Sequence, residues 1–406
     1  MEHIDFDAYS PAQMAARVEK AGITKGNLDF FSTFVLAVMA GVFIALGGVL
    51  YIYVIHDSTM CLGLTKLLGG VVFCLGLVLV IVAGAELFTG NNLIVMAYVS
   101  RKITLEQLLR NWSIVFAGNL FGSLVIAFLI LFTGQWSTGG AMVGVKTLMI
   151  ANSKVNLTFL QALSRGILCN MLVCLAVWLC FSGRSVTDKI LAIIFPITAF
   201  VALGFEHSVA NMYFIPAGLL VRHIQPVLAA AQSASGSLPD LSRLTISGFF
   251  LYNLLPVTIG NIIGGSIFVA SIYWFVYLRR SAAEPVRRCM TSGPPTVLIG
   301  SSVAEAVQIM KEHTCGSVLV GNGERALGIL SEEDIVYKVV GQNKNPASVK
   351  VEDVMSCPLI SVDIKKPVYE IYRTMAEHHI RHLLVTDSEK QVGFVSVRDL
   401  LRNPII

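Results

Sequence analysis

The stretch GFEHSVAN, residues 204–211, places a glutamate and a histidine inside an apolar run that extends from Ile190 to Leu220. Ionisable side chains at the depth of a membrane are costly, and they usually face a bundle interior or an aqueous path. An earlier apolar run contains GAELFTGN at residues 84–91, which repeats the pattern G-x-E-x-x-x-x-N. Two apolar segments interrupted by the same polar pattern favour a pore or transporter built from inverted repeats.

The composition separates a membrane part from a soluble part. Of the 406 residues, 55% are apolar and 14% are charged, and the mean hydropathy is +0.71, which is too apolar for an ordinary soluble protein. Charged residues are sparse over 28–278 and dense from 279 onward. We expect an N-terminal cytoplasmic segment at 1–27, a membrane domain at 28–280, a linker at 281–288 and a soluble module at 289–406, with halves 289–343 and 350–406.

The same composition disfavours several functional classes. The net charge of +4 is small and no face rich in basic and aromatic residues is visible, so a nucleic-acid partner is not indicated. The eight cysteines form no C-x-x-C pair, which argues against a zinc ribbon or a redox motif. A Walker motif, a metal-spaced histidine pair and a nucleophile elbow are also missing, so we expect neither an enzyme nor a metal site.

Six apolar segments are each near or above the roughly 20 residues that a helix needs to span a bilayer. They are 28–55, 67–99, 112–133, 162–182, 189–221 and 249–278. The second and fifth contain the polar stretches and are about 33 residues long, which exceeds one simple crossing. We predict a break in each, because non-helical backbone at membrane depth is tolerated only where protein buries it or where it lines a cavity. Ahead of them, Ser10-Pro11 predicts the start of a short helix.

The third and sixth segments share an internal signature. Asn111 precedes Gly118-Asn119 by seven positions, and Asn253 precedes Gly260-Asn261 by the same seven. Small residues at this spacing let helices pack closely. Segments one to three and four to six therefore read as two copies, and because three is odd the second copy is inverted. Lys and Arg are richer on the side that carries the N-terminus, so we expect both termini in the cytoplasm.

The chain resembles the formate–nitrite transporter family over about residues 8–280, through LFTGN at 87–91, GFEHSVANM at 204–212 and PVTIGNIIGG at 256–265. MLVCLAVW at 171–178 and SGRS at 182–185 look most similar to bacterial formate channels. This resemblance implies an α-helical membrane protein, an aquaporin-like six-helix bundle from two inverted three-helix repeats with broken second and fifth helices. It also implies a homopentamer in a bacterial inner membrane, with one pore per protomer.

The resemblance also implies which residues form the pore. Thr89 and His207 would lie at its centre with Asn170 and Lys154 alongside, and the apolar constrictions would be formed by Phe73, Leu77 and Phe200. Without the resemblance, Lys154 is a loop lysine and the three apolar residues face the core or lipid by default. The residues after Thr89, GNN at 90–92, are more typical of nitrite or hydrosulfide members, so these anions are alternative cargoes to formate.

The chemistry of a small carboxylate explains why such residues are needed. Moving a bare carboxylate through a medium of low dielectric costs tens of kcal/mol in idealised estimates, whereas protonating an acid of pKa ~4 at pH 7 costs about 4 kcal/mol. Lys154 and the helix ends would attract the anion. His207 would then donate the proton, because imidazole titrates near neutral pH, and Asn170 would orient it by a hydrogen bond. We expect Glu206, like Glu86, to bind backbone amides freed by the breaks.

The soluble part contains a second internal repeat without gaps, in which equivalent residues of the two copies are always the same number of positions apart. At that spacing Met290 aligns with Met355, Gly328 with Gly393 and Asp334 with Asp399. Each copy reads as helix, strand, strand, helix. GILSEED at 328–334 and GFVSVRD at 393–399 share the pattern G-x-x-S-x-x-D, which resembles a tandem pair of cystathionine-β-synthase (CBS) domains. We therefore expect a cytoplasmic α/β module made of two related halves.

CBS pairs commonly bind an adenine nucleotide (AMP, ADP or ATP) in the clefts between their copies. By that resemblance Ser331 and Ser396 would face phosphate or ribose, and Asp334 and Asp399 would bind the ribose hydroxyls. Phosphate charge would be met by Arg398 or Arg381. The alternative from chemistry alone is that these serines and aspartates are only helix caps.

These features lead to one main hypothesis and two alternatives. The main hypothesis is a membrane channel for formate, proton-linked through His207 and modulated by an adenine nucleotide, with no cofactor needed for transport itself. The first alternative keeps the channel but carries nitrite or hydrosulfide. The second is a membrane-anchored nucleotide sensor with a vestigial pore. In each case the expected partners are membrane lipid and further copies of the chain.

Overall fold

The computed structural model describes residues 8–279, 286–323, 325–378, 380–388 and 390–402. Predictions for residues 1–7 and for 280–285, most of the expected linker, lie outside this range. The chain divides into two compact units, Met1–Arg279 and Arg280–Ile406.

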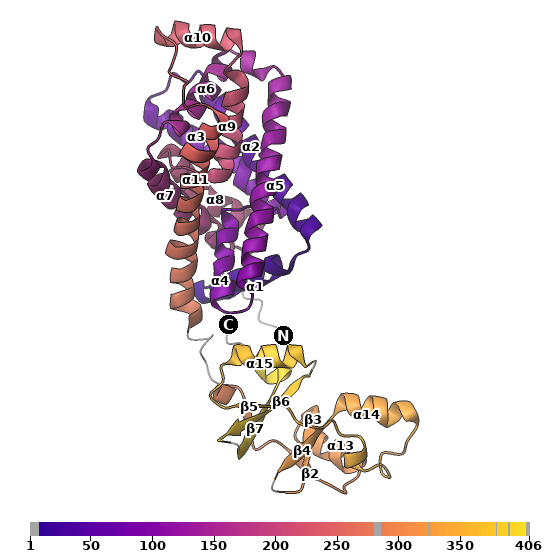
Figure 1. Cartoon of the computed structure of the whole chain (residues 1–406). Coiled ribbons are helices and arrows are strands. Elements are labelled where there is room, and N and C mark those ends of the chain that lie inside the picture. The colour runs from indigo at the N-terminus through magenta and orange to yellow at the C-terminus, as the bar shows by residue number, and fades with distance from the viewer. Residues whose placement is uncertain (1–7, 280–285, 324, 379, 389, 403–406) are drawn as a thin grey trace. The chain divides into compact units, whose positions relative to one another are not determined.

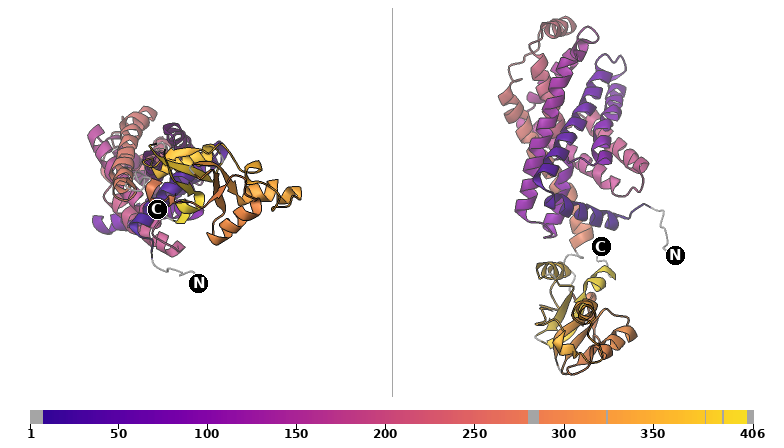
Figure 2. Two further views of the ribbon diagram at one scale, coloured as in Figure 1. Left: turned by 90° about the horizontal axis from the view of Figure 1, so that it is seen from below. Right: turned by 90° about the vertical axis from the view of Figure 1, so that its right-hand side faces the viewer.

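The first unit is a bundle of helices (Figures 1 and 2). Its elements are α1 (Pro11–Asn27), α2 (Phe30–Ile55), α3 (Leu62–Ala83), η1 (Gly90–Ile94), α4 (Val95–Val99), α5 (Leu105–Phe132), η2 (Gln135–Ser137), α6 (Met142–Val155), α7 (Phe159–Cys180), α8 (Val186–Ala202), α9 (Ser208–Val221), α10 (Gln225–Ser235), η3 (Gly248–Leu254), α11 (Leu255–Ile262), η4 (Ile263–Ser271) and η5 (Trp274–Leu278). Figure 1 shows α1 and α10 at opposite ends of this bundle.

Five of the described helices are long and apolar enough to cross a membrane by length and composition: α2, α3, α5, α7 and the stretch Gly248–Leu278. The count rises to six if α9 and α10, bent by 98°, form one span. The fifth predicted segment, 189–221, is divided between α8 and α9, and each of these is short. The helical membrane fold is therefore as predicted, while α6 and α10 are helices that the sequence analysis did not anticipate.

Both predicted interruptions are present, and a glycine begins each of them. Gly84 follows α3 with φ +80°, and Gly204 follows Leu203, the C-cap of α8, with φ +69°. This left-handed conformation ends a helix and is strained for residues that carry a Cβ atom. Helical structure resumes at Gly90 and at Ser208. Each glycine stands two positions before the glutamate of its stretch, so the breaks are equivalent parts of a repeat.

The predicted close packing of the third and sixth segments is also present. A Cβ atom on Gly122 of α5 would lie 2.0 Å from the carbonyl oxygen of Val38 on α2. A Cβ atom on Gly264 of η4 would lie 2.2 Å from the carbonyl oxygen of Ile167 on α7. Only glycine allows the backbones to approach this closely. The same helix crossing therefore occurs once in each repeat.

The second unit contains two sheets with packed helices. Its elements are η6 (Val286–Arg288), β1 (Thr291–Ser292), β2 (Thr296–Leu298), α13 (Val303–Glu312), β3 (Ser317–Gly321), β4 (Ala326–Ser331), α14 (Glu332–Lys338), η7 (Val340–Gln342), η8 (Val351–Asp353), β5 (Ser361–Asp363), α15 (Val368–Glu377), β6 (His382–Asp387), β7 (Lys390–Ser396) and α16 (Val397–Arg402). The strand orders are β2-β3-β4 and β1-β7-β6-β5.

The expected order of helix, strand, strand, helix is incomplete in both copies. Each copy also contains a three-residue strand ahead of its first α-helix, β2 or β5, which pairs in parallel with β3 or β6. These strands are too short to show a periodicity in sequence. The constant spacing of the repeat relates α13 to α15, as predicted, and it also relates the unexpected strands β2 and β5. Strand β1 lies at the start of the first copy but pairs with β7 of the second, which joins the two copies.

Candidate functional site

The two breaks bring Thr89 and His207 together. His207 precedes α9, and its Nδ1 atom accepts a hydrogen bond of 3.0 Å from the backbone N–H of Ala210. Its Nε2 atom lies 2.9 Å from Oγ1 of Thr89. A backbone N–H can only donate, so the ring proton of a neutral His207 is on Nε2 and is donated to Thr89. Both side chains are buried.

Apolar side chains gather on one side of His207. The ring of Phe200 stacks on His207 with centroids 5.8 Å apart, and Phe73 meets Phe200 edge-on at 5.8 Å. Leu77 lies one turn after Phe73 on α3, and both side chains are buried. The three residues expected at apolar constrictions are therefore all buried in the core of the unit, and two of them form a continuous ring contact with the histidine.

Glu206 is the centre of a buried polar network. Its Oε1 atom accepts a hydrogen bond of 3.0 Å from Nζ of Lys154, and its Oε2 atom accepts from Nδ2 of Asn211 at 2.7 Å and of Asn253 at 3.0 Å. The expectation that Glu206 binds freed backbone amides is wrong, since its partners are side chains. Lys154 is also not a loop residue: it lies in the last turn of α6, and the carboxylate of Glu206 compensates its charge.

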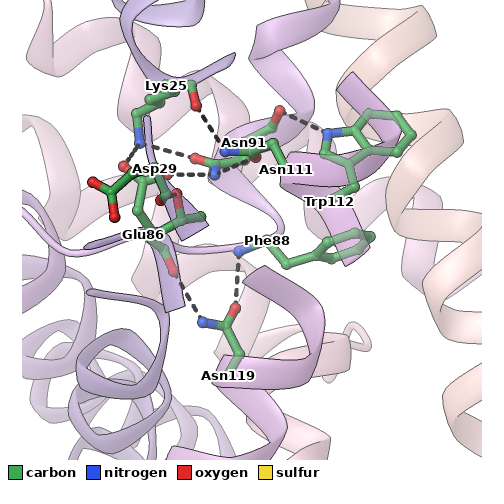
Figure 3. Close-up of polar contacts among 9 residues, drawn as sticks. Lys25, Asp29, Glu86, Phe88, Asn91, Asn111, Trp112 and Asn119 are labelled. Atoms are coloured by element: carbon green, nitrogen blue, oxygen red, sulfur yellow. Dashed lines mark hydrogen bonds and ion pairs between the residues drawn. The ribbon is translucent and has the colours of Figure 1, made fainter. Parts of the chain in front are cut away.

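An equivalent network surrounds Glu86 (Figure 3). Nζ of Lys25, on α1, lies 2.7 Å from Oε1 of Glu86, and Nδ2 of Asn91 lies 2.6 Å from Oε2. The same Nδ2 atom donates to Oδ1 of Asn111 at 3.0 Å. The backbone amides are not the partners of this glutamate either. Each break is thus fixed by a lysine, a glutamate and two asparagines, and the sequence analysis missed the lysine and the asparagines as members of one site.

Two further asparagines take the freed backbone amides. Oδ1 of Asn119 accepts from the N–H of Phe88, and Oδ1 of Asn261 accepts from the N–H of Ser208, each at 2.9 Å. The Nδ2 atom of each asparagine donates to the main-chain carbonyl of the glutamate in the same break. The repeated Gly-Asn pair was the sequence signal for these residues, but it was interpreted only as a sign of close packing.

Asn170 does not orient His207 as expected, because both ring nitrogens already have other partners. Instead its Nδ2 atom lies 3.2 Å from the carbonyl oxygen of Thr89, 2.9 Å from Oδ1 of Asn92 and 2.7 Å from the carbonyl oxygen of Asn261. Asn170 therefore links α7 to the first break and to α11. Its Oδ1 atom is buried and has no hydrogen-bond partner among the described residues.

The second unit contains a cleft of about 1020 Å³. All six residues expected to bind a nucleotide line it, namely Ser331, Asp334, Arg381, Ser396, Arg398 and Asp399. The two serines also cap helices, because Ser331 Oγ accepts from the N–H of Asp334 and Ser396 Oγ accepts from the N–H of Asp399, each at 3.2 Å. The two serines therefore cap helices and line the cleft at the same time.

A histidine that the sequence analysis did not select also lines this cleft. Nε2 of His382 lies 3.0 Å from Oγ of Ser317, the residue at the equivalent position of the first copy, and the ring stacks on Phe394. Burial lowers the pKa of His382, so the imidazole is neutral at neutral pH. The equivalence of these two positions in the repeat was the available sequence signal.

Comparison with known proteins accounts for both units. The formate/nitrite transporter family model matches residues 12–275, and the CBS domain model matches residues 286–341 and 351–405. Formate channel FocA of Escherichia coli K12 is 45% identical over 278 residues, which cover 68% of this chain and 97% of FocA. FocA of Haemophilus influenzae is 41% identical over 261 residues, or 64% of this chain and 92% of that protein.

A solved structure described as a pentameric formate channel with formate bound is 42% identical and has a TM-score of 0.57. It covers 62% of this chain, which covers 98% of that channel. These relatives are channels and not enzymes. Over most of their length they match the first unit, and the CBS pair is additional to it. The chain therefore belongs to the formate/nitrite transporter family and carries a tandem pair of CBS domains.

Proposed function

We propose that this protein is a formate channel of a bacterial cytoplasmic membrane, with both termini and the CBS pair in the cytoplasm. The protomers form a homopentamer, and an adenine nucleotide bound to the CBS pair modulates the flux. The buried contact between Thr89 and His207, formed where the two breaks meet, carries this proposal. The similarity to proteins named as formate channels supports the choice of cargo.

In this proposal His207 supplies the proton that neutralises formate. The neutral ring holds its proton on Nε2, and losing it would leave an imidazolate, which is too costly. His207 must therefore first gain a proton on Nδ1, which displaces the contact with the N–H of Ala210. The imidazolium then transfers its Nε2 proton to a formate oxygen. Formic acid leaves past Phe200 and Phe73, and the neutral ring then carries its proton on Nδ1. A proton taken up from water at Nε2 restores the imidazolium for the next formate ion.

The contacts of residues 90–92 make nitrite and hydrosulfide less favoured as cargoes than formate. Asn91 bonds to Glu86 and Asn111, and Asn92 bonds to Asn170. Asn91 and Asn92 therefore stabilise the break, and the hydrogen bonds described for His207 are with Thr89 and Ala210 instead. Formate remains the cargo that the comparisons favour.

Flux measurements on the purified full chain in liposomes test this function. We expect formate to equilibrate much faster than in protein-free liposomes at acidic external pH and without nucleotide. Nitrite and hydrosulfide, measured in parallel, separate the cargo alternatives. Faster flux of either anion than of formate would contradict the formate assignment. If no anion moved through the full chain or through a chain ending at Arg280, a sensor with a vestigial pore would be the better interpretation.

Removing the CBS pair tests the regulatory part. The FocA relatives consist almost entirely of the first unit, so a chain ending at Arg280 is expected to fold and conduct. A nucleotide changes flux only if it binds the open and closed states with different affinity. We expect AMP, ADP or ATP to change formate flux through the full chain and to leave the truncated chain unaffected. An equal nucleotide response in both chains would exclude the CBS pair as the regulatory site.

A further inference from the structure

The two aspartates of the CBS cleft have different surroundings. Oδ2 of Asp334 accepts hydrogen bonds from the N–H and the hydroxyl of Ser331, at 3.0 Å and 2.6 Å. Its Oδ1 atom accepts from Nζ of Lys338 at 2.7 Å and from the hydroxyl of Ser356 at 2.8 Å. Nζ of Lys338 also donates to the carbonyl oxygen of Val354 at 2.8 Å, which holds the ammonium in place. Both carboxylate oxygens of Asp334 are therefore occupied, one of them by a cation.

Asp399 is different. Its Oδ2 atom accepts from the N–H and the hydroxyl of Ser396, at 2.8 Å and 2.5 Å, as in the first copy. No donor among residues 8–400 whose side chains the structure describes bonds to its Oδ1 atom. The repeat places Asn403, which has no charge, at the position equivalent to Lys338, although Asn403 itself lies outside the described residues. The carboxylate of Asp399 thus retains acceptor capacity that Asp334 has lost.

The charged residues that line the cleft also differ between the two copies, and the difference again favours a ligand at Asp399. The second copy contributes Arg381 and Arg398 to the cleft. The equivalent positions of the first copy are occupied by Gly316 and Glu333. Arg398 is the chain neighbour of Asp399, whereas Glu333 is the chain neighbour of Asp334, so the two halves present opposite charges beside the equivalent aspartates. Nη1 of Arg381 lies 3.5 Å from Oε2 of Glu333 and both side chains are largely exposed, so this pair is weak enough for a phosphate to displace.

We propose that the cleft binds one adenine nucleotide per chain, with the ribose on Asp399, and that Lys338 blocks the equivalent site on Asp334. The inference rests on the proposed nucleotide binding and specifies its position. A ribose diol needs a carboxylate with free lone pairs, and at Asp334 it would have to displace an ammonium that is already hydrogen-bonded.

Calorimetric titration of the solubilised full chain tests this proposal. We expect one AMP, ADP or ATP per chain in the wild type. Asp399→Asn should weaken binding by about tenfold or more, the effect of losing hydrogen bonds to a charged group, and Asp334→Asn by less than about threefold. Thermal melting verifies that each variant is folded. Two nucleotides per chain in the wild type, or binding that is lost in folded Asp334→Asn but kept in Asp399→Asn, would overturn the proposal.

Lys338→Met provides a gain of binding that a misfolded variant cannot give. Removal of the ammonium leaves only the hydroxyl of Ser356 on Oδ1 of Asp334 among the described donors, so that this oxygen can accept a second hydrogen bond. Adenosine avoids the repulsion between a phosphate and Glu333. We expect one adenosine per chain in the wild type and two in Lys338→Met. A stoichiometry of one in both would overturn the blocking role of Lys338. If the wild type bound no AMP, ADP or ATP and Lys338→Met bound no adenosine, nucleotide binding itself would be wrong, while formate flux would still test the channel separately.

Discussion

Replacing His207 by asparagine is expected to lower formate flux at neutral pH by about a hundredfold, the lower end of what a positioned proton donor contributes. Asparagine can cap α9 with its side-chain oxygen in the place of Nδ1, but it is too short to reach Thr89 and cannot carry a proton. At lower external pH the neutral acid becomes abundant and enters without a donor. The flux of the variant should therefore rise more steeply on acidification than that of the wild type. Liposome flux measured between about pH 4.5 and about pH 7.5 gives both values.

Comparison of His207→Ala with His207→Asn distinguishes the role of His207 as a proton donor from its role as a helix cap. This variant loses the donor and also the acceptor for the N–H of Ala210, so it should be less stable than His207→Asn by about 1 kcal/mol. Thr89→Val keeps the shape beside His207 and the proton itself, and it should retain a pH dependence like that of the wild type. Equal flux at neutral pH through His207→Asn and the wild type would rule out the donor role.

Much of the architecture could be predicted because it depends on local pattern. An apolar run that exceeds one crossing and has Gly-x-Glu in its middle is too long and too polar for one helix, and the structure breaks there, at Gly84 and Gly204. The repeat in the soluble part likewise carried over from sequence to structure, because each copy folds as the same unit. Predicting these features does not require knowing which residues, distant in sequence, are in contact.

The partners of the buried charges could not be predicted, because they lie far apart in the sequence. Glu206 meets Lys154 and Glu86 meets Lys25, and the members of these pairs are separated by 52 and 61 positions in the chain. Neither spacing corresponds to neighbours on one helix. The roles of Lys154 and Asn170 were therefore assigned by resemblance to a pore, while the structure shows an ion pair and a link between elements.

Glu206→Ala is expected to lower the free energy of unfolding by about 3–5 kcal/mol, the cost of leaving a buried charge without its partner. The side chain of Lys154 is 14% exposed and that of Glu206 is 4% exposed, so water cannot replace the lost carboxylate. Asn211 and Asn253 would also lose an acceptor for their Nδ2 atoms. Equilibrium unfolding of the solubilised protein in mixed micelles measures this change.

The double variant Glu206→Gln with Lys154→Met distinguishes an unpaired charge from lost packing. It removes both charges, keeps an amide oxygen for Asn211 and Asn253, and should regain most of the stability lost in Glu206→Ala. Glu86→Ala is the matched control, because the network is the same but its lysine, Lys25, is 32% exposed and can be hydrated. We expect a smaller loss there than in Glu206→Ala. Equal losses at the two glutamates would mean that the networks stabilise the breaks by hydrogen bonding alone, and that the burial of Lys154 adds nothing.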